Sequence, residues 1–185
     1  MIYTKPDSLS LSFSQNNFSS VKPSEYLNEN NLPVIFVLED VRSGNNVGSF
    51  FRTGDAFCIS GVELCGITGH PPHRDILKTA LGASDHIPWR GHSSASEAIS
   101  QLRTEGYKIA AVEQDPRSVS LSNWSPNPEE KWAFVFGNEV RGVQKTTCDS
   151  VDIILEIPQL GVKKSMNVSV CAGIVLWHAS QGMRG

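Results

Sequence analysis

The chain has 185 residues, of which 39% are hydrophobic and 19% charged, a composition that fits one globular domain with a sizeable core. Its net charge of −3 argues mildly against nucleic-acid binding, so a nucleic-acid role would depend on a local basic patch. No apolar run approaches the roughly 20 residues that span a bilayer, and the polar N-terminus is unlike a secretory signal. The four cysteines form no Cys-x-x-Cys pair and are expected to be reduced, buried thiols. We therefore expect a cytoplasmic protein without membrane contact.

Residues 1–32 are rich in Ser and Asn and poor in large apolar side chains. We interpret them as a polar, partly mobile extension with one short helix near 23–28. The remaining residues, 33–185, contain the periodic apolar segments and are expected to form a single domain.

Apolar runs predict strands, and apolar positions at helical spacing predict helices. Strands are expected over 33–38, 62–65, 107–112, 132–136 and 151–157. Helices are expected from a cap at Asn45–Asn46, over 75–81, from Ser94 to Glu105 and over 167–181. The stretch 115–128 is expected to be loop, and a turn region is expected to end at Asp149. Strands that alternate with helices indicate an α/β fold with a mostly parallel sheet and helices on both faces.

Ligand sites of parallel sheets lie beyond the carboxyl ends of the strands. Four predicted strand ends are followed by polar residues: the segments 45–52, 113–115, 137–142 and 165–167. Arg52 stands out among apolar or small neighbours, although an exposed ion pair with Asp55 or Asp40 would explain it equally well. Gly137 either begins a turn or lets a ligand approach the backbone closely.

A metal site has little support in the sequence. His70 and His73 are three residues apart, but they flank Pro71–Pro72, and no thiolate lies at ligand spacing. Neither a phosphate-binding loop of the Walker type nor a Gly-x-Gly-x-x-Gly motif is present. The residues by themselves therefore indicate a small α/β protein with a composite ligand site.

Three segments, 46–57, 134–142 and 157–169, together resemble the three motifs of the SpoU (TrmH-like) RNA ribose 2′-O-methyltransferases of the SPOUT class. The resemblance spans roughly residues 34–177. It implies that 33–185 form a SPOUT methyltransferase domain with a deep C-terminal trefoil knot, a rare exception to the rule against threaded chains. It also implies a homodimer and S-adenosyl-L-methionine as cofactor.

The resemblance also implies roles for single residues. Arg52 would be catalytic, by orienting an RNA phosphate and the 2′-hydroxyl and by stabilising the developing oxyanion. A role for Arg52 as general base would need an unusual loss of its proton. Asn46, Glu139 and Asn167 would form the polar framework around it, unless they only cap helices and turns. The cofactor would be contacted by Val112, Gly137, Ile157, Ser165 and Met166, the last replacing the usual Leu.

The implied substrate is RNA, with tRNA as the leading class and ribosomal RNA as the alternative. Candidate RNA contacts are Arg42, Arg141, Lys163 and Lys164, and an accessory RNA-binding protein would compensate for the small number of cations. Two other functions compete with this one. One is a non-catalytic module that binds RNA or the cofactor with the same fold, and the other is a metal-dependent hydrolase that uses His70 and His73.

Overall fold

The computed structural model describes residues 31–163 and 165–184. The helix expected near 23–28 and the candidate RNA contact Lys164 lie outside the described residues. In the described part of the chain, no helix is long and apolar enough to cross a membrane.

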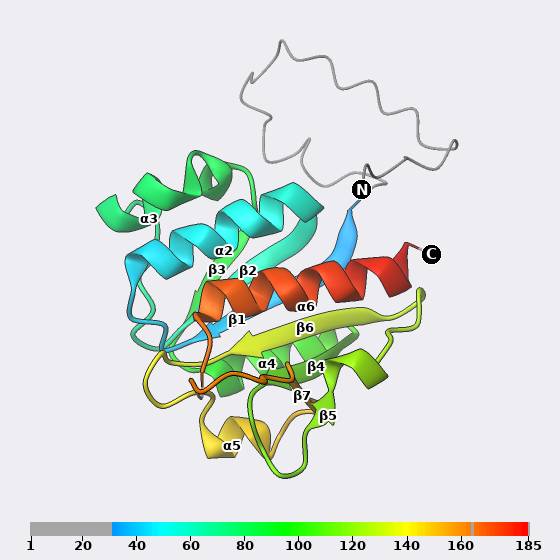
Figure 1. Ribbon diagram of the computed structural model, residues 1–185. Helices are drawn as coiled ribbons and strands as arrows, with labels where there is room; N and C mark the ends of the chain where they lie inside the picture. Colours follow the sequence, from blue (N-terminus) through cyan, green and yellow to red (C-terminus); the bar gives the residue numbers. More distant parts are fainter. Residues whose placement is uncertain (1–30, 164, 185) are drawn as a thin grey trace, which may run out of the picture.

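Seven strands form one sheet in the order β3-β2-β1-β6-β4-β7-β5, and every neighbouring pair is parallel (Figure 1). The predicted α/β class with a mostly parallel sheet is confirmed. The strands are β1 Leu32–Glu39, β2 Ile59–Cys65, β3 Trp89–His92, β4 Tyr107–Val112, β5 Val119–Ser120, β6 Lys131–Phe136 and β7 Ile153–Glu156.

Helices cover both faces of the sheet. Helices α2, α3 and α6 pack on one face, where α2 and α6 lie side by side, and α4 lies on the other (Figure 1). The helices are α2 Gly44–Phe57, α3 Arg74–Ala80, α4 Ala95–Thr104, α5 Lys145–Cys148 and α6 Val168–Met183, with single 3-10 turns at Ala83–Asp85 and Leu121–Asn123.

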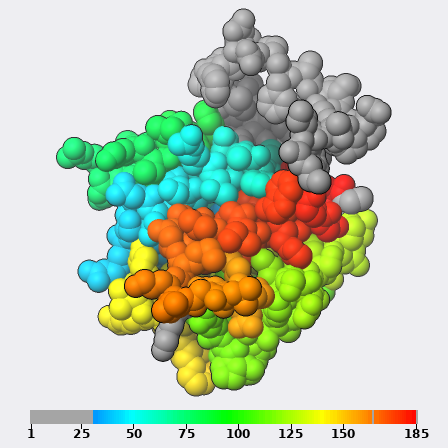
Figure 2. Space-filling model, in the orientation of Figure 1, coloured from blue at the N-terminus to red at the C-terminus, as the bar shows by residue number. Residues whose placement is uncertain are grey.

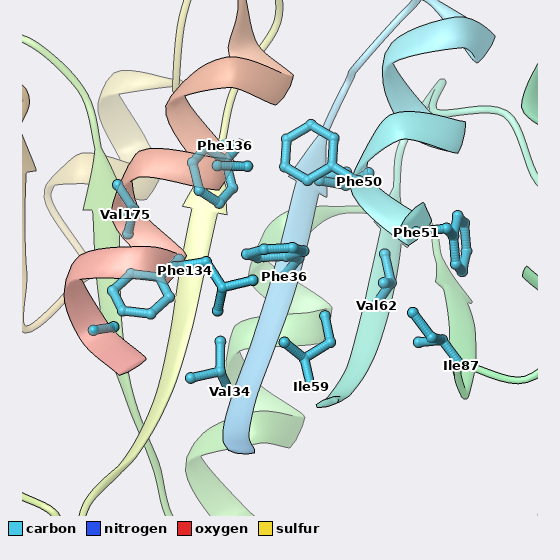
Figure 3. Packing of buried hydrophobic residues seen from close by; sticks show 14 of the residues in the cluster. Val34, Phe36, Phe50, Phe51, Ile59, Val62, Ile87, Phe134, Phe136 and Val175 are labelled. Atoms are coloured by element: carbon cyan, nitrogen blue, oxygen red, sulfur yellow. The ribbon is translucent and has the colours of Figure 1, made fainter. Parts of the chain in front are cut away.

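The larger core lies between the sheet and the pair α2 and α6. Phe36 of β1, Phe50 of α2 and Phe136 of β6 meet edge to face with ring centroids 5.1–5.5 Å apart, and all three are fully buried (Figure 3). Edge-to-face packing adds to the large apolar area that each ring buries. This cluster fixes α2 above the carboxyl ends of β1 and β6.

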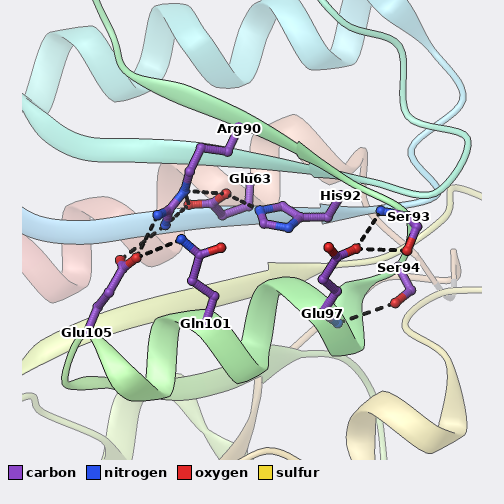
Figure 4. A network of polar contacts seen from close by, with 8 residues as sticks. All are labelled: Glu63, Arg90, His92, Ser93, Ser94, Glu97, Gln101 and Glu105. Carbon is purple, nitrogen blue, oxygen red and sulfur yellow. Dashed lines mark hydrogen bonds and ion pairs between the residues drawn. The ribbon is translucent and has the colours of Figure 1, made fainter.

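The strand β3 was not predicted from the sequence. It pairs with β2 so that Arg90 lies opposite Glu63, a carboxylate that is only 2–3% exposed (Figure 4). Arg90 bonds both Glu63 and Glu105, and His92 contacts Glu63 at 2.6 Å. A buried charge needs a partner, so this edge strand is held by polar contacts. Such contacts leave no apolar pattern in the sequence from which the strand could be predicted.

Three further predictions need correction. The N-cap of α2 is Ser43, whose side chain accepts from the Asn46 N–H, and not Asn45 or Asn46. The stretch expected to be loop contains β5 and a 3-10 turn, and the expected turn region contains α5. These elements have two to four residues each, too few for a periodic pattern to develop. The trefoil knot stays a prediction of the family resemblance.

Candidate functional site

A cavity of about 480 Å³ opens at the carboxyl ends of three neighbouring strands, β6, β4 and β7. The 137–142 loop after β6 and the 157–167 segment after β7 form its walls together with the strand ends. Figure 2 shows the latter segment in orange on the surface, directly before α6. Parallel sheets bind their ligands at this edge, and the volume is in the range of small-molecule sites.

The 137–142 loop is held closed by its own backbone. Asn138 and Gly142 exchange two backbone hydrogen bonds of 3.0 and 2.8 Å, and Gly142 has a positive φ of 71°. A Cβ built on Gly137 would lie 2.1 Å from the carbonyl carbon of Gly142. The missing side chain of Gly137 therefore makes room for the loop itself, although the residue also lines the cavity.

Glu113, at the end of β4, ties this loop to the sheet. Its carboxylate accepts the backbone N–H of Val143 at 2.8 Å and the N–H of Gln114 at 2.8 Å. A Cβ on Gly142 would lie 2.1 Å from the same carboxylate, so a side chain at this position would displace the Glu113 carboxylate. The carboxylate end of Glu113 thus lies against the loop that forms one wall of the cavity.

Three polar side chains from the three motif segments are linked by hydrogen bonds. The Asn167 side chain caps α6 by accepting from Ser169 N–H at 2.9 Å, and its amide donates to Oδ1 of Asn46 at 3.1 Å. The Asn46 amide in turn donates to Oε1 of Glu139 at 2.9 Å. Because the side-chain oxygen of Asn167 accepts the capping hydrogen bond, its NH₂ group is the donor toward Asn46. The donor and the acceptor of each hydrogen bond between Asn167, Asn46 and Glu139 are therefore set.

Glu139 also receives the backbone N–H groups of Arg42 and Ser43, at 3.1 and 3.0 Å. Partial desolvation by itself raises the pKa of Glu139, but the hydrogen bonds from its own backbone, Asn46, Arg42 and Ser43 together lower the pKa below its usual value. The carboxylate is therefore ionised, and it ties the 137–142 loop to the start of α2.

The structure brings the predicted cofactor residues together. All five line the cavity: Val112, Gly137, Ile157, Ser165 and Met166. Glu139 and Asn167 of the predicted polar framework line it too. Asn46 lies one hydrogen bond away from both Glu139 and Asn167. Residues of the segments 113–115, 137–142 and 165–167 thus line one cavity, and the segment 45–52 is joined to it through Asn46.

Arg52 lies outside this cavity. It is exposed on α2 and makes no hydrogen bond or ion pair with another described residue, while Asp40 bonds the Ile67 N–H and the Gln144 side chain instead. The side of α2 that faces α6 carries Asn46 and Phe57, and at 100° per residue Arg52 points well away from it. Arg52 therefore forms no ion pair with Asp55 or Asp40, and it does not line the cavity of its own chain.

Several lining residues were not among the predicted site residues. The polar ones and the cysteine are Glu113, Gln114, Asn138, Glu156, Gln159 and Cys171. Glu113 belongs to the segment 113–115 that the sequence marked as polar residues at a strand end. Glu156 is the last residue of β7 and was expected to lie inside the strand 151–157. Burial raises the pKa of the Cys171 thiol, so Cys171 contributes a neutral, apolar wall.

The remaining candidates lie on the surface. Arg42, Arg141 and Lys163 are exposed, and only Arg141 lines the cavity. His73 caps α3 by accepting the Asp75 N–H at 3.3 Å, while the His70 ring stacks on Trp89 with centroids 5.9 Å apart. The two histidines thus have separate structural roles.

The model of the SpoU rRNA Methylase family matches residues 33–177. Among curated proteins, the chain is similar to the tRNA (guanosine(18)-2′-O)-methyltransferase of Borreliella burgdorferi, with 32% identity over 149 residues that make up 80% of this chain and 66% of the relative. It is also similar to the 23S rRNA (guanosine-2′-O-)-methyltransferase of Vibrio vulnificus, with 26% identity over 174 residues, 89% of this chain and 69% of the relative.

Among solved structures, the fold is similar to that of an AdoMet-bound rRNA methyltransferase from Sinorhizobium meliloti. The TM-score is 0.73 at 24% identity, over 87% of this chain and 58% of that one. The chain spans between 56% and 69% of the length of the first four curated relatives that it matches. Because the family match covers most of the chain, the protein belongs to the SpoU rRNA methylase family.

Proposed function

We propose that the protein is an S-adenosylmethionine-dependent RNA ribose 2′-O-methyltransferase, with tRNA as its leading substrate class. The observation that carries the proposal is the hydrogen-bonded chain Asn167–Asn46–Glu139, which joins all three motif segments at the rim of one cavity. The Borreliella relative, named for a tRNA guanosine, supports tRNA, and the Vibrio relative supports ribosomal RNA as the second candidate. A site that had lost its activity would not be expected to keep this connection intact.

The volume of the cavity and the polarity of its lining suit the proposed cofactor. Val112, Ile157 and Met166 provide an apolar wall suited to an adenine ring. Glu113 and Glu156 place carboxylates in the lining, which suits a ligand with an ammonium and a sulfonium group. When bound, S-adenosylmethionine supplies a methyl group already activated by its sulfonium. What remains for the protein is mainly to position the acceptor hydroxyl.

Arg52 is proposed to provide that positioning. An exposed guanidinium with no partner among the described residues can bind a phosphate and a neighbouring hydroxyl together. It would also stabilise negative charge on the ribose oxygen as the proton leaves. Because Arg52 lies outside the cavity of its own chain, it would have to act at the cavity of another chain.

A homodimer would solve this problem. The face of α6 that points away from the core exposes Val170 by 50%, Ile174 by 36% and Trp177 by 54%. An apolar stripe of this size on a helix favours association with a second copy. Arg52 lies on the solvent-exposed surface of α2, which packs beside α6, and we infer that in such a dimer it serves the partner's cavity.

Two measurements test the proposed function. Isothermal titration calorimetry should show that the chain binds S-adenosylmethionine. Mapping of 2′-O-methyl groups in RNA from cells with and without the gene should then show the loss of a specific site. Cofactor binding without any lost methyl group would favour a non-catalytic binding module, and a lost ribosomal RNA site would favour the second candidate.

A further inference from the structure

Three large apolar side chains stand almost fully in solvent around the mouth of the cavity. Val140, on the 137–142 loop, is 82% exposed, and Leu160 and Val162, on the 157–167 segment, are 102% and 99% exposed. Single exposed apolar residues are common on protein surfaces. Here three of them gather on the two loops that line one cavity, and such a gathering indicates a contact surface.

Each of these loops also carries a cation next to its apolar residue. Arg141 follows Val140, and Lys163 follows Val162. Neither cation has an ion pair with a described carboxylate, whereas Arg90, Arg103, Lys108, Arg117 and Lys145 are all ion-paired. The five residues Val140, Arg141, Leu160, Val162 and Lys163, which we call the rim, therefore combine apolar surface with uncompensated positive charge.

Three rim residues, Leu160, Val162 and Lys163, lie on the 157–167 segment and project away from the rest of the fold. None of residues 158–163 shares a backbone hydrogen bond with another described residue, and a Cβ on Gly161 would meet no heavy atom within 4 Å. Leu160 and Val162 thus have no apolar partner within the described part of this chain. A ligand that covers them would come from outside it.

We propose that the rim is a docking surface for an unpaired RNA strand, a proposal that rests on the proposed function. Unpaired nucleotides expose flat apolar base faces together with phosphates, so bases can lie on Leu160 and Val162 while Arg141 and Lys163 bind phosphates. An A-form duplex hides its base faces and offers only phosphates and hydroxyls, which would leave the apolar side chains uncovered. The rim therefore selects single-stranded segments or loops.

Charge argues against a second copy of the chain as the occupant. Where a patch lies on the axis of a two-fold dimer it meets its own copy, so Arg141 and Lys163 would there face like charges. Like charges on opposite sides of an interface destabilise it. The rim is better matched to a polyanion than to another rim.

The test is fluorescence anisotropy with a labelled, unstructured 12-nucleotide RNA and with a fully paired, blunt-ended RNA duplex. The double variant Leu160→Ser and Val162→Ser should lose about tenfold in affinity for the unpaired RNA and little for the duplex, with an unchanged salt dependence. The double variant Arg141→Gln and Lys163→Gln should instead flatten the salt dependence, by roughly 0.7 in logarithmic slope for each phosphate that the variant no longer binds. Ile67→Ser is the matched control, since Ile67 is 67% exposed but follows β2 and lies on neither of the two loops that carry the rim.

Unchanged affinity of the Leu160 and Val162 variant for the unpaired RNA, or an equal loss of affinity for the duplex, would overturn the proposal. A change in its sedimentation would also overturn it, because the rim would then lie between two copies. Calorimetric binding of S-adenosylmethionine keeps the two proposals separate. If the wild-type chain fails to bind the cofactor, the proposed function fails, whereas cofactor binding with an RNA affinity indifferent to the rim removes only the docking surface.

Discussion

The side-chain amide of Asn46 donates a 2.9 Å hydrogen bond to Oε1 of Glu139, a residue 93 positions further along the chain. The bond joins the first turn of α2 to the loop after β6, two segments that follow neighbouring strands of the sheet. Asn167 extends the connection to the start of α6. The mouth of the cavity is thus a network that couples three distant parts of the sequence.

Glu139→Gln should destabilise the fold by about 1–2 kcal/mol at neutral pH, because an amide cannot accept all the hydrogen bonds that the carboxylate accepts. Since the pKa of Glu139 is lowered in the folded chain, its contribution is present above the pKa of the unfolded chain and is lost as pH falls through the folded value. Urea unfolding at pH 7 and at pH 3 should therefore show a smaller difference between wild type and variant at pH 3. An equal difference at both pH values would contradict the assignment.

Gly137→Ala should disrupt the cavity, because the added Cβ would lie 2.1 Å from backbone atoms of Gly142 and Val143. We expect a lower melting temperature and loss of S-adenosylmethionine binding in calorimetry. Gly161→Ala is the matched control, since its Cβ would enter open space, and it should change neither quantity by much. Comparable behaviour of the two variants would show that close packing of the loop is not required.

Glu156→Gln tests the charge of the cavity. Removing a carboxylate from the lining should weaken S-adenosylmethionine binding a few-fold, on the order of 0.5–1 kcal/mol for a solvent-accessible charge. The loss should be smaller for S-adenosylhomocysteine, which lacks the sulfonium charge. Calorimetry with both ligands measures this, with Glu129→Gln as control because Glu129 is exposed and outside the cavity. Identical affinities in wild type and Glu156→Gln would remove Glu156 from the cofactor site.

The double variant Val170→Gln and Ile174→Gln tests the proposed dimer. Wild type should sediment near twice 20.2 kDa, and the variant should sediment as a monomer because the apolar stripe of α6 is lost. Glutamine preserves helix propensity, so α6 itself should persist. Leu77→Gln, on the exposed side of α3, provides the comparison. A wild-type monomer at micromolar concentration would refute the dimer.

The predictable parts of this fold were those with long, regular signals. The buried runs that form β1, β4 and β6 and the cap at Asn167 all lie where the sequence indicates. The edge strand β3 escaped prediction because Arg90 and His92 are held by Glu63, a contact between strands 27 or more residues apart in sequence.

The sequence predicted which segments contribute to the site better than it predicted where each side chain lies. Gly137, Ile157 and Met166 do meet at one cavity, because parallel strands place their carboxyl ends together. No pattern could tell that Arg52 points away from that cavity, since the direction depends on which side of α2 packs against α6. Relations between packed helices are set by the tertiary fold and not by local sequence.

The most direct test of the proposed function is methyl transfer by Arg52→Ala. Transfer from labelled S-adenosylmethionine to unmodified tRNA should be measured alongside calorimetric binding of the cofactor, with Lys78→Ala, another exposed cation on a helix, as control. We predict that Arg52→Ala binds the cofactor as wild type does and transfers no methyl group, while Lys78→Ala stays active and the label lies on a ribose 2′-oxygen. Retained transfer by Arg52→Ala, or label on a base instead of a ribose, would contradict the proposed function.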